Sequence, residues 1–281
     1  MKRNVIKLIK IIIDKIIFIL YKTKFGIYFN DRLVSSAMNR VLDVTYNNLL
    51  FKFAVPNKLC VWRAETFEKK EPETLNWIDQ MKEGSIVWDI GANVGLYSIY
   101  MAKKKKCKVF AFEPSVFNLE LLARNIFLNK LSNVINIVPL AFSDKLGPGN
   151  MKMTTTEWGG ALAVFNENFG WDGNIFNEVF EFITMGLTMD DAITLLKIPQ
   201  PEYIKIDVDG LEHFILKGGY NVLKNVKQIL IEINDDFKEQ ADDCRQILEN
   251  AGLYLIEKKH SEMFTNSSLG FQNSYNQIWK R

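Results

Sequence analysis

The stretch Ser85–Ala102, SIVWDIGANVGLYSIYMA, decides the fold expected for this chain. It begins with a short apolar run, passes through an acidic residue and a loop that contains Gly91 and Gly95, and continues as an apolar segment. A strand, a glycine turn and a helix in this order form the first half of a βαβ unit. Because glycine has no Cβ, Gly91 and Gly95 allow the backbone of the turn to approach a ligand closely.

Strands and helices continue to alternate after this first unit. Such alternation predicts an α/β fold, in which a parallel sheet is covered by helices. A helix is expected over Val116–Leu128 and another after the strand that contains Asp207. The further predicted strands are Lys108–Pro114 (KVFAFEP), Val134–Asp144 (VINIVPLAFSD), Glu202–Gly210 (EYIKIDVDG) and Gln228–Asn234 (QILIEIN).

Acidic or amide residues end four of the predicted strands. In an open parallel sheet the ligand crevice lies at the carboxyl ends of the strands, so these side chains should converge on one cleft. They are Asp89, Glu113, Asp207 with Asp209, and Glu232 with Asn234.

The turn and the second strand together indicate the cofactor. Glu113 follows Gly95 by eighteen positions and ends the second strand, where a carboxylate accepts hydrogen bonds from a ribose diol. The turn reads D-I-G-A-N-V-G and lacks the G-x-G of dinucleotide sites. Asp89 at its mouth would repel a diphosphate and attract the cationic amino-acid end of S-adenosylmethionine. The residues therefore favour S-adenosylmethionine over NAD. Neither a phosphate-binding G-x-x-x-x-G-K-[ST] loop nor a G-x-S-x-G nucleophile turn is present.

Composition excludes several other classes of protein. Of the 281 residues 48% are hydrophobic and 24% charged, as in ordinary globular domains. The net charge of +2 gives no electrostatic footprint for DNA or RNA, so we expect no nucleic-acid partner. Three cysteines without a C-x-x-C pair indicate a reducing, cytoplasmic location. Two histidines exclude a His-rich metal centre.

The segment Val5–Tyr21, VIKLIKIIIDKIIFILY, is the most apolar part of the chain. It is shorter than the ~20 apolar residues that span a bilayer, and charged residues interrupt it. We expect an amphipathic helix whose apolar face rests on a membrane surface, on its own domain or on the second subunit of a homodimer. The charged residues that share the opposite face are Lys7, Lys10, Asp14, Lys15 and Lys22.

Residues 25–84 mix short apolar alternations with polar turns. They predict one or two hairpins and then a helix over Pro72–Lys82, with Pro72 in its first turn. The expected domain organisation is therefore an amphipathic helix (1–24), an N-terminal elaboration (25–84) and a cofactor-binding domain (85–281).

The ordered motifs resemble those of the FkbM family of methyltransferases. They are VWDIGANVGLYS (Val87–Ser98), FAFEPS (Phe110–Ser115), IVPLAFSD (Ile137–Asp144), LTMDDAI (Leu187–Ile193), YIKIDVDGLEHFILKGG (Tyr203–Gly219) and ILIEIN (Ile229–Asn234). The resemblance implies the class I methyltransferase fold, a Rossmann-like, mostly parallel sheet of seven strands with one antiparallel strand, here expected from QNSYNQIWKR. It also implies methyl transfer from S-adenosylmethionine, most often to a hydroxyl of a sugar, glycan or polyketide.

The resemblance also implies roles for single residues. The residues implied to line the cofactor are Asp89, Gly91, Asn93 and Gly95 at the methionine end, Glu113 with Pro114 at the ribose, and Ser143 with Asp144 at the adenine. Asp207 is implied to lie nearest the reacting methyl group. Asp209 stands where the family more often has Glu.

Methyl transfer to an alcohol needs a group that takes the proton of the acceptor. The candidate catalytic residues are Asp207, Asp209, Glu212 and Glu232. Like charges this close would raise one carboxyl pKa towards neutrality, which suits a general base. Alternatively the carboxylates bind Mg²⁺ or Ca²⁺, or Asp209 and Glu212 form a helix capping box. His213 is a further candidate base.

These observations predict a cytoplasmic O-methyltransferase of glycan biosynthesis, either free or peripheral to the membrane, that acts on a saccharide, a glycan precursor or a similar small molecule. N-methylation of a small molecule and a catalytically silent cofactor-binding scaffold are the alternatives. Between Gly147 and Gly186 a long segment rich in aromatic residues and Asn is expected as a loop, with Thr154–Phe182 either a substrate lid or ordinary packing at the edge of the core.

Overall fold

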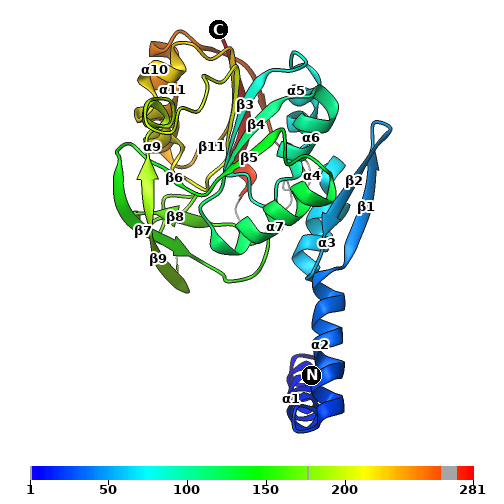
Figure 1. Cartoon of the computed structure of the whole chain (residues 1–281). Helices are drawn as coiled ribbons and strands as arrows, with labels where there is room; N and C mark the ends of the chain where they lie inside the picture. The colour runs from blue at the N-terminus through cyan, green and yellow to red at the C-terminus, as the bar shows by residue number, and fades with distance from the viewer. Residues whose placement is uncertain (1, 176, 261–270) are drawn as a thin grey trace.

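The computed structural model describes residues 2–175, 177–260 and 271–281, and its elements alternate as the sequence predicts (Figure 1). The strands are β1 (Val41–Tyr46), β2 (Leu49–Ala54), β3 (Ile86–Ile90), β4 (Lys108–Phe112), β5 (Ile135–Val138), β6 (Ala141–Phe142), β7 (Gly147–Met153), β8 (Ala163–Phe165), β9 (Phe180–Leu187), β10 (Tyr203–Ile206), β11 (Gln228–Asn234), β12 (Tyr254–Lys259) and β13 (Ser274–Lys280). The helices are α1 (Lys2–Leu20), α2 (Lys24–Met38), α3 (Lys58–Glu65), α4 (Phe67–Lys70), α5 (Pro72–Asp79), α6 (Leu96–Lys105), α7 (Val116–Leu128), α8 (Met189–Thr194), α9 (Glu212–Lys217), α10 (Tyr220–Leu223), α11 (Lys238–Asn250) and the 3₁₀ turn η2 (Phe271–Asn273).

A seven-stranded sheet with the strand order β12-β13-β11-β10-β3-β4-β5 forms the centre of the molecule. The five strands from β11 to β5 pair in parallel, and β13 is antiparallel to both of its neighbours. The C-terminal segment therefore supplies the expected antiparallel strand. This confirms the predicted α/β class and the mostly parallel seven-stranded sheet of class I methyltransferases.

Helices cover both faces of this sheet (Figure 1). On one face α5, α6 and α7 pack against β3 and β4, and the β1–β2 hairpin extends the same apolar core. On the other face α8, α9, α10 and α11 pack around Trp88, Ile204 and Ile231. Because both faces are covered, β10 is buried along its whole length, including the side chain of Lys205.

Two asparagines on α7 satisfy the free edge of β2. Asn125 accepts a hydrogen bond from the Ala54 N–H at 2.7 Å and donates to the Val94 carbonyl at 2.8 Å. Asn129 accepts from the Lys52 N–H at 3.1 Å and donates to the Lys52 carbonyl at 2.7 Å. The side-chain amides replace a neighbouring strand, so the backbone groups of β2 are paired although β1 covers only its other edge.

The structure differs from the prediction in two places before β7. Helices α2, capped by the Thr23 hydroxyl, α3 and α4 form between residues 24 and 70, where only hairpins and turns were expected. The strand expected over Val134–Asp144 breaks at Pro139, which lacks the N–H needed to continue the ladder. Its first part, β5, stays in the main sheet, and its second part, β6, joins another sheet.

The segment expected as a long loop between Gly147 and Gly186 instead forms most of a four-stranded sheet with the order β6-β9-β7-β8. The side chain of Phe165 is buried in the small core of this sheet. The connection from β7 to β8 is held down by the side chain of Asn57, which donates to the Trp158 carbonyl at 2.9 Å. Phe165 therefore acts as packing, and a lid role for the rest of Thr154–Phe182 stays a prediction, with Phe176 outside the described residues.

Helices α1 and α2 project away from the α/β domain. Figure 1 shows α2 as a stalk and α1 at its far end. The two helices meet closely at Gly26, where a Cβ would come within 1.9 Å of the Leu20 carbonyl oxygen. Among the described residues, no helix has the length and apolar character needed to cross a membrane.

We predict that Asn125→Ala lowers the free energy of unfolding by roughly 2–4 kcal/mol, because two buried backbone groups lose their partners. Urea unfolding followed by circular dichroism measures this change. Asn136 on the exposed side of β5 provides the matched control, and Asn136→Ala should change stability by less than about 0.5 kcal/mol. Equal effects of the two substitutions would contradict the role given to Asn125.

Candidate active site

The glycine turn after β3 lies directly against the end of β10. Gly91 has a φ of +80°, and a Cβ there would come within 1.9 Å of the Asp207 carbonyl oxygen. Only glycine fits this position, because any side chain would separate the turn from the strand. Asn93 also has a positive φ, of +50°. The turn therefore presents its backbone to the cleft at the carboxyl ends of β3 and β10.

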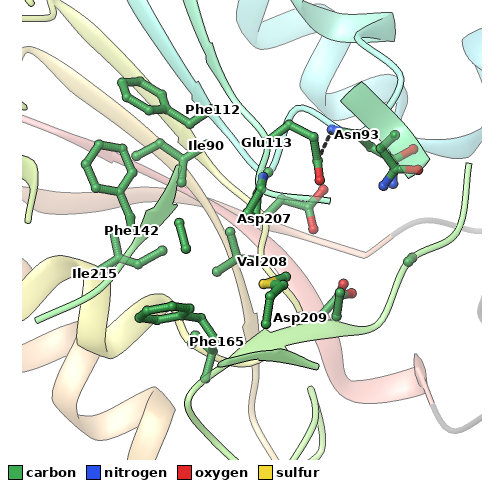
Figure 2. A pocket seen from close by; sticks show the side chains of 18 of the residues that line it. Ile90, Asn93, Phe112, Glu113, Phe142, Phe165, Asp207, Val208, Asp209 and Ile215 are labelled. Atoms are coloured by element: carbon green, nitrogen blue, oxygen red, sulfur yellow. Dashed lines mark hydrogen bonds between the residues drawn. The ribbon is translucent and has the colours of Figure 1, made fainter. Parts of the chain in front are cut away.

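Glu113 lies beside this turn at the carboxyl end of β4 (Figure 2). Its Oε2 accepts a hydrogen bond from the Asn93 N–H at 2.7 Å, and its Oε1 accepts one from the Ser115 N–H at 2.8 Å. Both bonds fix the orientation of the carboxylate and leave each oxygen able to accept a second hydrogen bond. Burial raises the pKa of Glu113 to about 7.

A cleft opens next to Glu113 at the carboxyl ends of the strands. Its inner half contains a cavity of about 70 Å³. Figure 2 shows apolar side chains on one side of this space and the carboxylates of Glu113, Asp207 and Asp209 on the other. The apolar lining residues are Ile90, Phe112, Pro114, Leu140, Ala141, Phe142, Met151, Ala161, Ala163, Phe165, Val208, Leu211 and Ile215.

The outer half of the cleft is larger, about 270 Å³, and more polar. Gly91, Asn93, Asp207 and Asp209 line both halves, so the two spaces are continuous. The residues that line the outer half and not the inner half are Trp62, Arg63, Lys70, Glu71, Leu162, Glu232, His260, Ser274 and Asn276. An apolar inner half thus opens into a polar outer half at Asp207 and Asp209.

Asp207 lies where the inner and outer halves of the cleft meet, and its carboxyl group is ionised. Its Oδ2 accepts a hydrogen bond from the Lys205 ammonium at 2.8 Å. Burial opposes ionisation of Asp207, but Lys205, supported by Lys70, outweighs burial and holds the pKa of Asp207 well below its usual range. Asp207 therefore remains ionised at any physiological pH.

The pKa values of Asp209 and Glu232 are raised, whereas that of Asp207 is lowered. Burial, and then the negative charge of Asp207, raise the pKa of Asp209 to about 6. Burial and Asp207 also raise the pKa of Glu232 well above its usual value. Asp209 has a φ of +60°, and its Oδ2 accepts a hydrogen bond from the Leu162 N–H at 2.7 Å. The structure therefore brings together three of the four predicted catalytic carboxylates.

Glu212, the fourth predicted catalytic residue, is not part of the cleft lining. Its Oε1 accepts from the Val208 N–H at 3.0 Å, and its Oε2 accepts from the Gly210 N–H at 3.1 Å and from the Gln240 side chain. Burial raises the pKa of Glu212 to about 8. Glu212 thus supports the loop that carries Asp209, close to the capping interpretation, although Asp209 itself faces the cleft.

The predicted cofactor residues divide into two groups. Gly91, Asn93, Glu113 and Pro114 line the cleft. The others, Asp89, Gly95, Ser143 and Asp144, are not among its lining residues. Asp89 is buried within β3 and accepts a hydrogen bond from the Ser98 hydroxyl at 2.5 Å, and the Ser143 hydroxyl donates to Asp144 at 3.1 Å. Contact of these four residues with a ligand stays a prediction.

His213, a further candidate base, does not line the cleft. Its ring is fully buried, and burial lowers its pKa to about 4. It packs against the rings of Phe214 and Phe237 and is not part of the cleft lining. Across the described ranges, no three His, Cys, Asp or Glu side chains are arranged to hold a metal ion.

Sequence reasoning missed several residues that line the cleft. Arg63 and Lys70 come from α3 and α4, within a segment that carries no motif, and Asn276 comes from β13. Asn118 in α7 lines the inner half and holds the β7–β8 connection by donating to the Gly160 carbonyl at 3.1 Å. Their positions depend on tertiary packing, so no local sequence pattern predicts that they line the cleft.

Comparison with known proteins identifies the family. The model of the methyltransferase FkbM domain matches residues 89–254, more than half of the chain. The chain belongs to the FkbM methyltransferase family. It is an S-adenosylmethionine-dependent methyltransferase, as its motifs predicted.

Individual relatives of this FkbM methyltransferase are distant. The hexuronic acid methyltransferase AglP of Haloferax volcanii is 22% identical over 183 residues, which cover 65% of this chain and 70% of AglP. Among solved structures, precorrin-6y C5,15-methyltransferase from Geobacter metallireducens has a TM-score of 0.45 and 15% identity, covering 82% of this chain and 93% of its own. TYW2 of M. jannaschii in complex with AdoMet has a TM-score of 0.44 and 14% identity, covering 86% of each chain.

The cleft of this FkbM methyltransferase fits the cofactor. The Glu113 carboxylate is held by two backbone N–H groups in a fixed orientation, which suits a ribose diol. The apolar inner half suits an adenine ring. Because Gly91 has no Cβ, the amino-acid end of the cofactor can lie close to the backbone of the turn.

We predict that the affinity for S-adenosylhomocysteine rises with pH up to about 7 and is constant above it. The diol donates to the ionised form of Glu113, so below its pKa of about 7 the site must lose a proton to bind. Isothermal titration calorimetry at several pH values measures this dependence.

Glu113→Gln is the matched variant for this prediction. It should bind the ligand about 10- to 100-fold more weakly, because two charge-assisted hydrogen bonds are lost. Its remaining affinity should not follow the same pH dependence. Wild-type affinity that falls as the pH rises towards 7 would contradict the assignment.

Proposed function

We propose that this methyltransferase transfers a methyl group to a hydroxyl of a saccharide or of a glycan precursor. The observation that carries the proposal is the polar outer half of the cleft, which meets the carboxylates of Asp207 and Asp209. Trp62 offers an aromatic ring and Asn276 an amide, two side chains that suit a sugar ring and its hydroxyls. The relation to AglP, a hexuronic acid methyltransferase by name, supports the same substrate class.

In the proposal, the cofactor occupies the inner half of the cleft. Glu113 accepts hydrogen bonds from the ribose, and the adenine packs between Pro114 and Phe142. The amino-acid end lies along the turn from Gly91 to Asn93, near the negative charge of Asp207. When bound, S-adenosylmethionine supplies an electrophilic methyl group on a positively charged sulfur.

Residues of the outer half would hold the acceptor hydroxyl in line with that methyl group. Arg63 is fixed by a hydrogen bond from its Nε to the Gly159 carbonyl at 2.7 Å, so its guanidinium has a defined position. Alignment of acceptor oxygen and methyl carbon is the main requirement of this reaction. We propose that residues 41–84 belong to the catalytic unit, since they carry Trp62 and Arg63.

Asp209 is the proposed general base. It lines both halves of the cleft, so its carboxylate lies where cofactor and acceptor meet. With a pKa near 6 it is ionised at neutral pH and is still basic enough to take a proton as the acceptor oxygen forms its new bond to carbon. The Leu162 N–H holds Oδ2, which leaves Oδ1 for the acceptor hydroxyl. Asp207, always ionised, would orient groups rather than accept a proton.

We predict that Asp209→Asn lowers kcat by about 10²- to 10⁴-fold while the affinity for S-adenosylhomocysteine changes little. In the wild-type enzyme, kcat/KM should rise with pH through about 6, because the base must be ionised to act. Steady-state kinetics across this range checks both statements.

Glu232→Gln is the comparison for Asp209→Asn. It removes a neighbouring cleft carboxyl whose pKa is raised by burial and by the charge of Asp207, so we expect a smaller loss of kcat and a wild-type pH profile. If Glu232→Gln instead abolished the ionisation near pH 6, Glu232 would replace Asp209 as the base.

The substrate class is tested by methyl transfer to a panel of hexuronosides, neutral hexosides and amino sugars. Mass spectrometry of the products should show a methyl ether on a sugar oxygen. Methylation of nitrogen in the amino sugars alone would replace this proposal by the N-methyltransferase alternative. Cofactor binding without turnover on any acceptor would favour the scaffold alternative.

A further inference from the structure

Helices α1 and α2 expose more apolar side chain than any other part of the described chain. Every residue of α1 from Val5 to Ile19 is exposed, although most of them are Ile, Leu or Phe. Ile9, Ile12 and Ile16 on the apolar face are each about half exposed, at 50%, 48% and 52%. This helix does not pack on the α/β domain, so its apolar face requires a partner outside the fold.

The apolar and charged residues of α1 lie on opposite sides. At 100° per residue, an arc of about 180° from Leu8 to Ile17 contains only apolar residues of the segment Val5–Leu20. Lys7, Lys10 and Lys15 lie on the other side, with Asp14 as the acidic residue among them. A helix of this kind suits the boundary between lipid headgroups and acyl chains, with its axis parallel to the membrane.

Charge is strongly separated along the chain. Residues 1–40 contain nine Lys or Arg and two Asp, a net charge of +7. Since the whole chain has a net charge of +2, residues 41–281 carry −5. An anionic lipid surface would therefore attract the N-terminal helices and repel the catalytic domain. A second copy of the same segment would place +7 beside +7, which opposes self-association through it.

Exposed aromatic residues gather where α1 joins α2. Tyr21 is 49% exposed, Phe25 72% and Tyr28 65%. Aromatic side chains favour the interfacial region of a bilayer, where part of the ring is in contact with headgroups. The 15 residues of α2 form a stalk about 22 Å long between this junction and β1. The stalk is long enough to keep the domain clear of the headgroups.

We propose that α1 lies in the surface of an anionic membrane, with its Ile/Leu face among the acyl chains and its lysines at the lipid phosphates, while α2 connects it to the catalytic domain. The proposal assigns the occupant of the exposed apolar face and does not depend on the nature of the methyl acceptor.

Flotation of the full-length protein with phosphatidylcholine vesicles, with or without phosphatidylglycerol, tests the proposal. We expect strong flotation with the anionic vesicles, at least tenfold weaker flotation with the neutral ones, and weakening by high salt. No flotation with either kind of vesicle would overturn the proposal, as would equal binding to both.

Neighbouring isoleucines on opposite faces provide a matched pair of variants. Ile12→Asn lies within the apolar arc and should lower the partition coefficient about tenfold or more, whereas Ile11→Asn lies between the lysines and should lower it far less. Equal effects would overturn the orientation. S-adenosylhomocysteine binding by both variants verifies that the catalytic domain is folded.

The competing occupant is a second copy of this chain. Light scattering after gel filtration, without lipid, should show a monomer. A dimer that Ile12→Asn dissociates would overturn the proposal, because the apolar face would then be covered by protein.

Discussion

The contact between the Gly91 turn and the end of β10 is the constraint on which the active site depends. The turn passes so close to the Asp207 carbonyl that no Cβ fits at Gly91. This approach places the Asn93 N–H at the Glu113 carboxylate, which is thereby oriented. It also brings β3, β4 and β10 to a single opening at their carboxyl ends. A larger distance between the Gly91 turn and the end of β10 would separate the cofactor side of the cleft from the carboxylates of Asp207 and Asp209.

The ionisation of the carboxylates at this opening depends on the buried ammonium group of Lys205. Burial opposes the charge of Lys205, but Asp207 and Asp89 outweigh burial and hold the pKa of Lys205 above its usual value. Lys205 in turn keeps Asp207 ionised, and the charge of Asp207 contributes to the raised pKa of Asp209. Neighbouring carboxylates on one loop thus acquire different proton affinities, which allows them to serve different purposes.

The sequence predicts the sheet well because its signals are local. Apolar runs, the glycine turn and acidic strand ends locate β3, β4, β10 and β11, and these ends meet as the topology requires. Glu212 shows the limit of this reasoning. Its spacing from Asp207 fits a catalytic cluster, yet it pairs with backbone N–H groups, because the helix start turns its side chain away from the cleft. Spacing alone does not fix the direction of a side chain.

Elements whose positions depend on long-range packing were less predictable. Arg63 reaches the cleft only because α3 packs beside the β7–β8 connection, 96 residues further along the chain, where it meets the Gly159 carbonyl. The strands between Gly147 and Gly186 pair with one another across long connections, and their many Gly and Asn residues resemble a loop. The α1 helix, by contrast, follows directly from the periodicity of its isoleucines.

A crystal structure of the complex with S-adenosylhomocysteine tests the central claim most directly. The account predicts the ribose hydroxyls on Glu113, the adenine against Phe142, and the sulfur directed towards Asp209 and the outer half of the cleft. A ligand bound with its sulfur facing away from Asp209, or bound outside the space between Gly91 and Glu113, would contradict it.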